Sequence, residues 1–218
     1  MKKRADRNHM KEIYQKKSMF YLFAKRVFDI LFSLVVLLCL SPLFLITSIV
    51  ILLEDGGPVF FSQSRMGKDG KPFLIYKFRS MSKGADQQMF ELMESNEQTG
   101  HAFKIKNDPR VTKVGRIIRR FSIDELPQLI NVIKGDMSIV GPRPILTFQM
   151  EECSDYEKQR LLVRPGLTCY WQISGRANIK WEQWIELDLD YIEDMSLWTD
   201  IKIIMRTVPA VFDREGAY

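Results

Sequence analysis

Apolar residues are concentrated near the N-terminus, where no Asp, Glu, Lys, Arg or His occurs between Ile30 and Leu53. The hydrocarbon core of a bilayer requires a run of about 20 apolar residues. Ser41-Pro42 interrupts this run, and a proline inside a helix removes a backbone hydrogen bond and clashes with the preceding turn. The pattern predicts a helix, a break and a second helix. We therefore divide the chain into a basic segment (1–24), a membrane anchor (25–55) and one folded catalytic or binding domain (56–218).

The charges around the apolar run bear on its topology. Basic residues precede it at Lys2, Lys3, Arg4, Arg7, Lys11, Lys16, Lys17, Lys25 and Arg26. Such residues hold a flank in the cytoplasm, yet the segment after the run is also basic. A re-entrant hairpin keeps both flanks on one side, whereas a proline-kinked helix can also span the bilayer. The residues alone leave both open. Asp29 lies at the entry to the run, and we expect it to pair with Arg26 or Lys25, because an interfacial acid usually has a basic partner.

Beyond the anchor, the pattern predicts an α+β fold that is mostly helical. Two short strands flank a glycine-rich turn and predict a β-hairpin. The expected strands are Val59–Gln63, Phe73–Phe78 and a brief Ser138–Val140; the expected helices are Val111–Phe121, Asp124 to just before Gly135, Leu146–Leu162, Lys180–Met195 and Leu197–Phe212. Residues 82–107 are expected to form a lid or a helix and loop, and residues 164–176 a binding loop. The last helix is amphipathic, which fits either core packing or a membrane interface.

Composition narrows the classes of function. The apolar fraction of 46% supports a packed core. The net charge of +5 fits anionic partners such as lipid headgroups, nucleic acid or phosphorylated small molecules, and it fits ordinary solubility charge equally well. The three cysteines show no paired spacing, which argues against a disulfide framework and a zinc site. Only His9 and His101 are present, which argues against a Ser-His-Asp hydrolase.

Two adjacent carboxylates, Asp124 and Glu125, lie just after a basic segment. Together with Ser122 they match a capping box, so capping a helix is one interpretation. Pro127 fits better if the helix begins near Asp124. In both cases the carboxylates lie at a helix N-terminus, where backbone amides attract anions.

The basic residues before this pair recur at every third position, at Arg110, Lys113, Arg116 and Arg119. On a helix they would form one cationic face. Nucleic-acid binding is disfavoured, because aromatic residues are not interleaved and no known module signature is present. Phosphoryl transfer fits better: cations neutralise the transferring group, a carboxylate attacks to form an aspartyl-phosphate, and Mg²⁺ relieves the repulsion.

A second acidic motif, Asp188-Leu189-Asp190, permits a metal-binding D-x-D interpretation, as in many nucleotide-sugar glycosyltransferases. It lies inside a predicted helix, where residues two apart point in different directions. As an isolated metal motif it is weak.

Several ordered motifs give the chain a strong family resemblance. They are KRVFD (25–29), SP (41–42), GPVFFSQSRMG (57–67), YKFRSM (76–81), NDPRVTKVG (107–115), SIDELPQ (122–128), KGDMSIVGPRP (134–144), RPGLT (164–168) and QISGR (172–176). With these motifs the chain resembles the bacterial monotopic phosphoglycosyl transferases, sugar transferases that start capsule, exopolysaccharide and glycan assembly on polyprenyl phosphate.

The resemblance implies a reaction and a site. Asp124 would attack the β-phosphorus of a UDP-sugar and release UMP, and Glu125 would assist with Mg²⁺ and with proton handling. Pro142, Arg143 and Pro144 match a motif associated with the uridine part; Arg119, Arg176 and Asp188 match positions linked to phosphate or to active-site architecture. Ser41 and Pro42 match the break of a helix that re-enters the cytoplasmic leaflet of the bacterial membrane. Cys169 stands where the family usually has glycine.

We therefore expect transfer of a sugar-1-phosphate to undecaprenyl phosphate or a similar lipid, with no nucleic-acid partner. One rival is a membrane-associated glycosyltransferase that uses the D-x-D motif and releases UDP. The other is a non-catalytic adaptor whose basic face binds anionic lipid or RNA. The sugar and the oligomeric state stay open.

Overall fold

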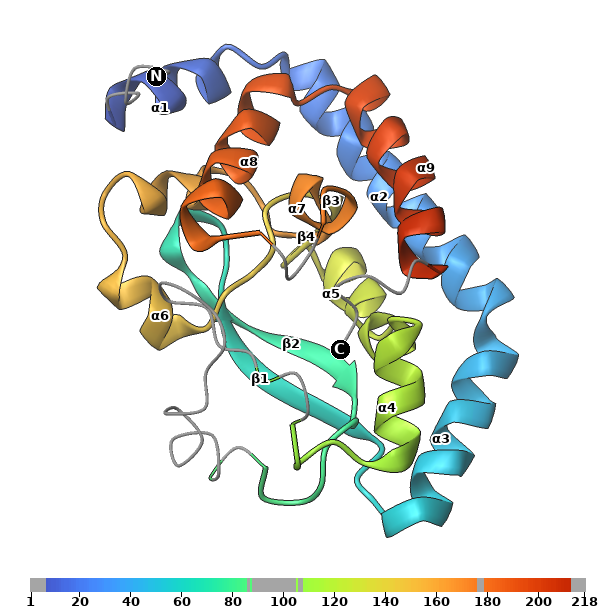
Figure 1. The fold of residues 1–218 in the computed structure, drawn as a ribbon. Coiled ribbons are helices and arrows are strands. Elements are labelled where there is room, and N and C mark those ends of the chain that lie inside the picture. Colours follow the sequence, from blue (N-terminus) through green and yellow to red (C-terminus); the bar gives the residue numbers. More distant parts are fainter. Residues whose placement is uncertain (1–6, 86, 88–104, 106–107, 176–178, 213–218) are drawn as a thin grey trace.

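The structure is a computed structural model that describes residues 7–85, 87, 105, 108–175 and 179–212. It is mostly helical, as predicted, and contains two small two-stranded sheets, of which the sequence predicted the β-hairpin (Figure 1). An N-terminal helix, α1 (Arg7–Gln15), was not predicted. It is followed by two long helices, α2 (Met19–Cys39) and α3 (Ser41–Asp55), which run along one side of the molecule (Figure 1).

The α2–α3 hairpin breaks at the predicted position. The two helices are separated by Leu40 and bent by 61°. Pro42 lies in the first turn of α3, where its missing N–H costs nothing, and the Ser41 hydroxyl donates to the Leu38 carbonyl at 2.8 Å. Among the described helices, none alone is long and apolar enough to cross a bilayer; α2 and α3 reach that threshold only as a bent pair.

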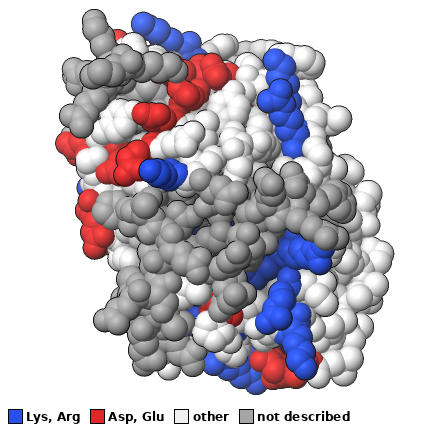
Figure 2. All heavy atoms as spheres, in the orientation of Figure 1, with Lys and Arg blue, Asp and Glu red and all other residues white. Residues whose placement is uncertain are grey.

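The outward face of this hairpin is apolar and its inward face is polar. Exposed positions include Phe20, Phe23, Leu38 and Leu53, each at least 68% exposed, whereas Lys25, Asp29 and Ser33 are buried against the rest of the protein. Figure 2 shows the edge along α2 and α3 largely without charged side chains. This polarity is the reverse of a helix that faces water.

The charged residues of α2 contact the protein rather than one another. Asp29 accepts from the backbone N–H of Ile139 at 3.1 Å, and Lys25 pairs with Asp200 at 2.8 Å. Arg26 donates to the last carbonyls of α5 (Gln128–Lys134), on Val132 and Ile133. The expected pairing of Asp29 with Lys25 or Arg26 is therefore wrong, because both cations have better acceptors in the folded domain.

The predicted β-hairpin is present. Strand β1 (Phe60–Met66), longer than expected, pairs antiparallel with β2 (Pro72–Phe78). The turn between them is a short 3₁₀ segment, Lys68–Gly70. Helix α5 packs on β2, where the buried Asn131 side chain bonds the backbone of Leu74 and Tyr76 at 2.7 and 3.0 Å.

A second sheet was only half predicted. Strand β3 (Ser138–Val140) pairs parallel with β4 (Gly166–Thr168), which lies in the expected binding loop. Gly166 permits the approach, because a Cβ there would lie 2.1 Å from the Gly141 nitrogen. The Gly166 N–H donates to the Pro142 carbonyl at 2.9 Å. The segment that begins at Pro142 is thereby held on β4.

The region expected as one helix, Leu146–Leu162, is divided into α6 (Thr147–Glu152) and a 3₁₀ helix, η5 (Glu157–Leu162). Ser154 causes the break, because its N–H and hydroxyl both bond the Glu157 carboxylate. Helix α7 (Tyr170–Ile173) lies within the expected loop, and α8 (Trp181–Asp194) fits its predicted range.

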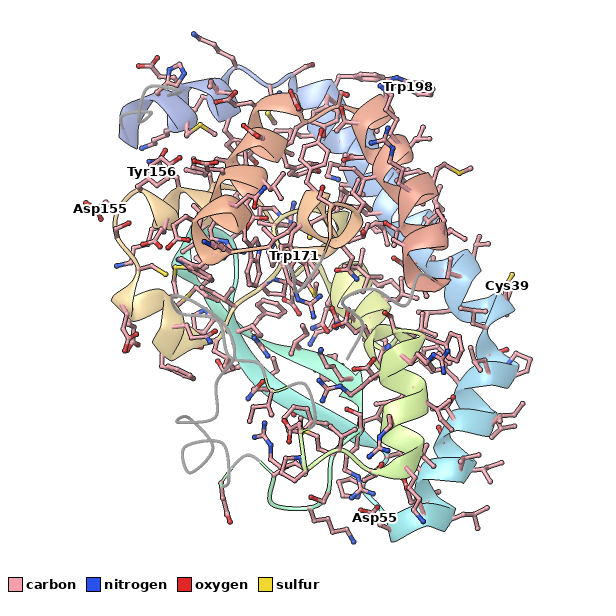
Figure 3. All side chains as sticks on the ribbon, in the orientation of Figure 1. Cys39, Asp55, Asp155, Tyr156, Trp171 and Trp198 are labelled. Atoms are coloured by element: carbon pink, nitrogen blue, oxygen red, sulfur yellow. The ribbon has the colours of Figure 1, made fainter. Side chains whose placement is uncertain are left out.

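Helix α9 (Leu197–Phe212) lies beside α2 (Figure 1). Its apolar stripe does not pack in the core: Trp198, Ile201, Met205 and Val208 are 43–68% exposed, and Trp198 points outward in Figure 3. The helix buries Asp200 and Ile203 instead. Core packing is therefore wrong for these four residues, although Ile204 of the same stripe packs against the core. The interfacial role of the exposed residues stays a prediction.

Candidate active site

The two candidate carboxylates lie on a short 3₁₀ helix, η4 (Ile123–Glu125), directly after α4 (Lys113–Arg120). Ser122 turns the chain between them in a left-handed conformation, with φ 54° and ψ 22°, and its side chain makes no capping bond. The capping box is therefore not formed. Asp124 and Glu125 are nonetheless buried, at 7% and 8% exposure.

Glu125 is held by two cations from distant segments. The Lys77 Nζ on β2 lies 2.9 Å from its Oε1, and a guanidinium nitrogen of Arg143 lies 2.6 Å from the same oxygen. Burial alone would raise the pKa of this carboxyl, but Arg143 and Lys77 outweigh it and hold the pKa well below its usual range. Glu125 is therefore an anion whose charge is locally neutralised.

Asp124 differs from its neighbour. Within the described part of the chain, no donor hydrogen-bonds its carboxylate. Burial raises its pKa above the ordinary value, and Glu125 adds to the rise, while Lys77, Arg119 and Arg143 oppose it. A buried carboxylate without a bound donor, surrounded by cations, is suited to attack an electrophile.

Arg143 belongs to the predicted Pro142-Arg143-Pro144 motif, between β3 and α6. Its guanidinium contacts Glu125 and the side-chain oxygen of Gln172 at 3.3 Å, and lies 5.4 Å from the ring centre of Trp171. Trp171 is part of α7 and is half-buried (Figure 3). A cavity of about 10 Å³, large enough for about one water, adjoins all three residues of the motif.

Of the other predicted site residues, Arg119 lies at the end of α4, where its positive charge lowers the pKa of Asp124. Arg176 lies outside the described residues, and Ser41 and Pro42 lie in the hairpin. The predicted cationic face is shorter than expected, because Arg110 precedes α4 and pairs with Asp108 at 2.6 Å. Figure 2 shows Lys and Arg side chains gathered where α4 lies.

Asp188 is not part of an accessible D-x-D pair. It is 1% exposed and pairs with Arg160 at 2.6 Å. Arg160, which the sequence did not single out, also donates to the Arg143 carbonyl at 2.6 Å. Arg160 lies at the end of the polar run Glu157-Lys158-Gln159, and nothing in that local pattern indicates a role for it. The geometry argues against Asp188 as a metal ligand.

The acidic residues could coordinate a metal ion only if a substrate supplied further ligands. No cluster of three or more potential ligands exists within the described ranges. Mg²⁺ is commonly held by one or two carboxylates together with substrate phosphates and water. The unpartnered Asp124 carboxylate fits that requirement, whereas the Glu125 oxygens already accept from Lys77 and Arg143.

The chain is similar to several bacterial proteins. It is 46% identical over 200 residues to a galactosyl transferase, CpsE, of Streptococcus agalactiae, covering 90% of this chain and 44% of that one. It is 42% identical over 199 residues to the exopolysaccharide production protein ExoY of Rhizobium meliloti, covering 89% and 88%. A third relative, at 42% over 202 residues and covering 89% and 41%, is the UDP-glucose:undecaprenyl-phosphate glucose-1-phosphate transferase of Escherichia coli.

The chain thus spans less than half the length of the first and third of these relatives. The family model for bacterial sugar transferases matches residues 20–214, which include the α2–α3 hairpin, both candidate carboxylates and α9. The chain therefore belongs to the bacterial sugar transferase family.

Proposed function

We propose that this protein transfers a sugar-1-phosphate from a UDP-sugar to undecaprenyl phosphate or a related polyprenyl phosphate, with release of UMP. The observation that carries the proposal is the contrast between the adjacent carboxylates: Asp124 is buried without a hydrogen-bond donor within the described structure, while Glu125 is neutralised by Lys77 and Arg143. The names of the relatives support the coarse reaction class.

The reaction proceeds in two steps. An Asp124 carboxylate oxygen attacks the β-phosphorus of the donor, the bond from that phosphorus to the bridging oxygen breaks, and UMP leaves with the electron pair. A phosphate oxygen of the polyprenyl acceptor then attacks the aspartyl-phosphosugar, which frees the carboxylate and forms the lipid diphosphosugar. Arg143 and Lys77 oppose the charge that accumulates on the transferring phosphate. Glu125, whose pKa these two cations lower, holds both of them at the site and is poorly suited to the proton handling expected of it.

Asp124, with Glu125 adjacent, would hold Mg²⁺. The ion would reduce the repulsion between the carboxylate and the donor phosphates. The protein's own side chains attack the donor, neutralise the developing charge and exclude water.

The α2–α3 hairpin places this chemistry at a membrane. We propose that it enters the cytoplasmic leaflet of a bacterial membrane and returns, because its exposed face is apolar, its buried face carries Lys25 and Asp29, and it is bent by 61° at the Ser41-Pro42 break. Polar groups at membrane depth need partners within the protein. On the inward face of the hairpin, the folded domain supplies those partners. The acceptor phosphate would then meet the site at the interface.

The Asp124→Asn variant tests the reaction. Purified protein is given a panel of UDP-sugars, Mg²⁺ and polyprenyl phosphate, and UMP and the protein-bound sugar-phosphate are measured. We expect the variant to release no UMP and to carry no adduct by mass spectrometry. The control is Asp190→Asn, which alters the second acid of the D-x-D motif and should retain activity. Turnover by Asp124→Asn close to that of the parent would refute the assigned nucleophile.

The same assay with UDP-sugars distinguishes this function from the two alternative functions. A D-x-D glycosyltransferase would release UDP, and the burial of Asp188 against Arg160 argues against it. A membrane adaptor would turn over no donor and would show salt-sensitive binding to anionic lipid or RNA.

A further inference from the structure

Arg160 occupies a fully enclosed position in η5. The residue is 2% exposed, and one guanidinium nitrogen lies 2.6 Å from Asp188 Oδ2 and also 2.6 Å from the Arg143 carbonyl oxygen. Its guanidinium is packed near two indoles, 5.9 Å from the Trp181 ring and 5.3 Å from the Trp184 ring. A cation placed over aromatic faces gains attraction where water is excluded.

A chain of contacts leads from this position back to the site. Trp184 stacks on Trp171, with ring centres 4.9 Å apart and planes inclined by 24°. Trp171 in turn lies beneath the Arg143 guanidinium. Arg143 is therefore held twice: Arg160 bonds its backbone carbonyl, and the stacked indoles support its side chain.

Nothing in this arrangement requires Asp188 to touch a substrate. Its carboxylate is 1% exposed and faces Arg160, while Arg143 is the member of the group that contacts Glu125. A buried ion pair is a poor source of net stability, because the desolvation cost offsets the attraction. The pair does fix the relative orientation of the two side chains, since the donors of a planar guanidinium point in fixed directions.

We propose that Arg160 and Asp188 are positioning residues that orient Arg143 toward Glu125 and the nucleotide donor. The inference rests on the function proposed above. It predicts that loss of the pair weakens use of the donor, through Arg143, and leaves use of the lipid acceptor largely unchanged. A role in core stability alone predicts no such selectivity.

The experiment uses a double variant, because Arg160→Met alone would leave the Asp188 charge buried without a partner, a change that is strongly destabilising. Arg160→Met/Asp188→Leu removes both charges and keeps the volume apolar. Thermal unfolding confirms that it is folded. The control is Tyr170→Phe, which removes the neighbouring hydrogen bond from Tyr170 to Asp194 without touching Arg143.

Two measurements follow in full-length protein. Calorimetric titration with UMP and Mg²⁺ reports nucleotide binding without turnover, and steady-state kinetics report kcat/KM for the UDP-sugar and KM for polyprenyl phosphate. We expect the double variant to lose about 10- to 100-fold in donor kcat/KM, as for a small misplacement of a positioned group, and to bind UMP more weakly. Acceptor KM should stay within about twofold.

A double-mutant cycle tests whether the effect passes through Arg143. In an Arg143→Lys background, the same double substitution should add less than about a twofold further loss, since coupled residues are not additive. A folded double variant with parental donor kinetics, or a full additive loss in the Arg143→Lys background, would overturn the proposal. Parent protein that binds UMP but releases none from any UDP-sugar would instead refute the proposed function.

Discussion

The Lys25 ammonium group in α2 lies 2.8 Å from the Asp200 carboxylate in α9, although 175 residues separate them in the chain. The Asp200 carboxylate also accepts from the Tyr191 hydroxyl at 2.8 Å, and Lys25 donates to the Val140 carbonyl at 3.2 Å. One buried network thus joins the α2–α3 hairpin, β3 and the last helix.

Removing one partner of this pair should destabilise the protein strongly. Lys25→Met leaves the Asp200 carboxylate buried without a cationic partner, and we expect a loss of about 3–5 kcal/mol in the free energy of unfolding. Denaturant unfolding in detergent micelles, followed by tryptophan fluorescence, measures it. Lys16→Met, at an exposed position of the preceding segment, is the control and should change little. A loss no larger than that of the control would contradict the structural role of the pair.

Lys77 should matter for catalysis more than for folding. The Lys77→Met variant leaves Arg143 as the main partner of Glu125 and removes a positive charge near the transferring phosphate. We expect UMP release to fall about 10²- to 10³-fold, as when a single preorganised electrostatic group is deleted, with the melting temperature close to that of the parent. Lys71→Met, at an exposed position before β2, should retain full activity. Equal rates for the two variants would exclude Lys77 from the site.

Ser122 adopts a left-handed conformation immediately before the carboxylates. Because glycine accepts this conformation without strain, Ser122→Gly should be neutral or slightly stabilising. Ser122→Val should cost about 1–3 kcal/mol, since a β-branched residue resists positive φ, and should reduce UMP release by shifting η4. The two variants are compared by denaturant unfolding and by the UMP assay. Equal stability of the valine and glycine variants would show that the turn is not constrained.

Cysteine labelling should report on insertion of the α2–α3 hairpin. Cys39 is exposed beside the bend and points outward (Figure 3), whereas Cys153 and Cys169 are buried. Burial raises the pKa of Cys153 to about 11 and that of Cys169 to about 12, so both stay protonated at neutral pH and react slowly. A membrane-impermeant maleimide should therefore leave protein in liposomes unlabelled and label all three cysteines after denaturation.

The same reagent distinguishes the two topologies. Lys11→Cys and Lys71→Cys place thiols before and after the hairpin. In inverted membrane vesicles both should react if the hairpin re-enters on the cytoplasmic face. Labelling of only one of them would favour a spanning helix, and rapid labelling of native Cys39 in liposomes would argue against burial of the bend in lipid.

The sequence by itself determined the elements whose signals are local. The apolar run and its proline predicted the broken pair of helices, the glycine-rich turn predicted the β1–β2 hairpin, and the periodicity of the last two segments predicted α8 and α9. The adjacent carboxylates and the ordered motifs indicated where the site lies. These features depend on residues close together in the chain, so the pattern can be read without the fold.

Tertiary structure alone decided which charges meet. No spacing pairs Lys25 with Asp200, joins Lys77 and Arg143 at Glu125, or encloses Arg160 between Asp188 and Arg143. The short strand β4 was missed for the same reason, because a three-residue strand has no period and exists only through pairing with β3. Burial sets the strength of an electrostatic interaction, and burial is a property of the whole packed domain rather than of a segment.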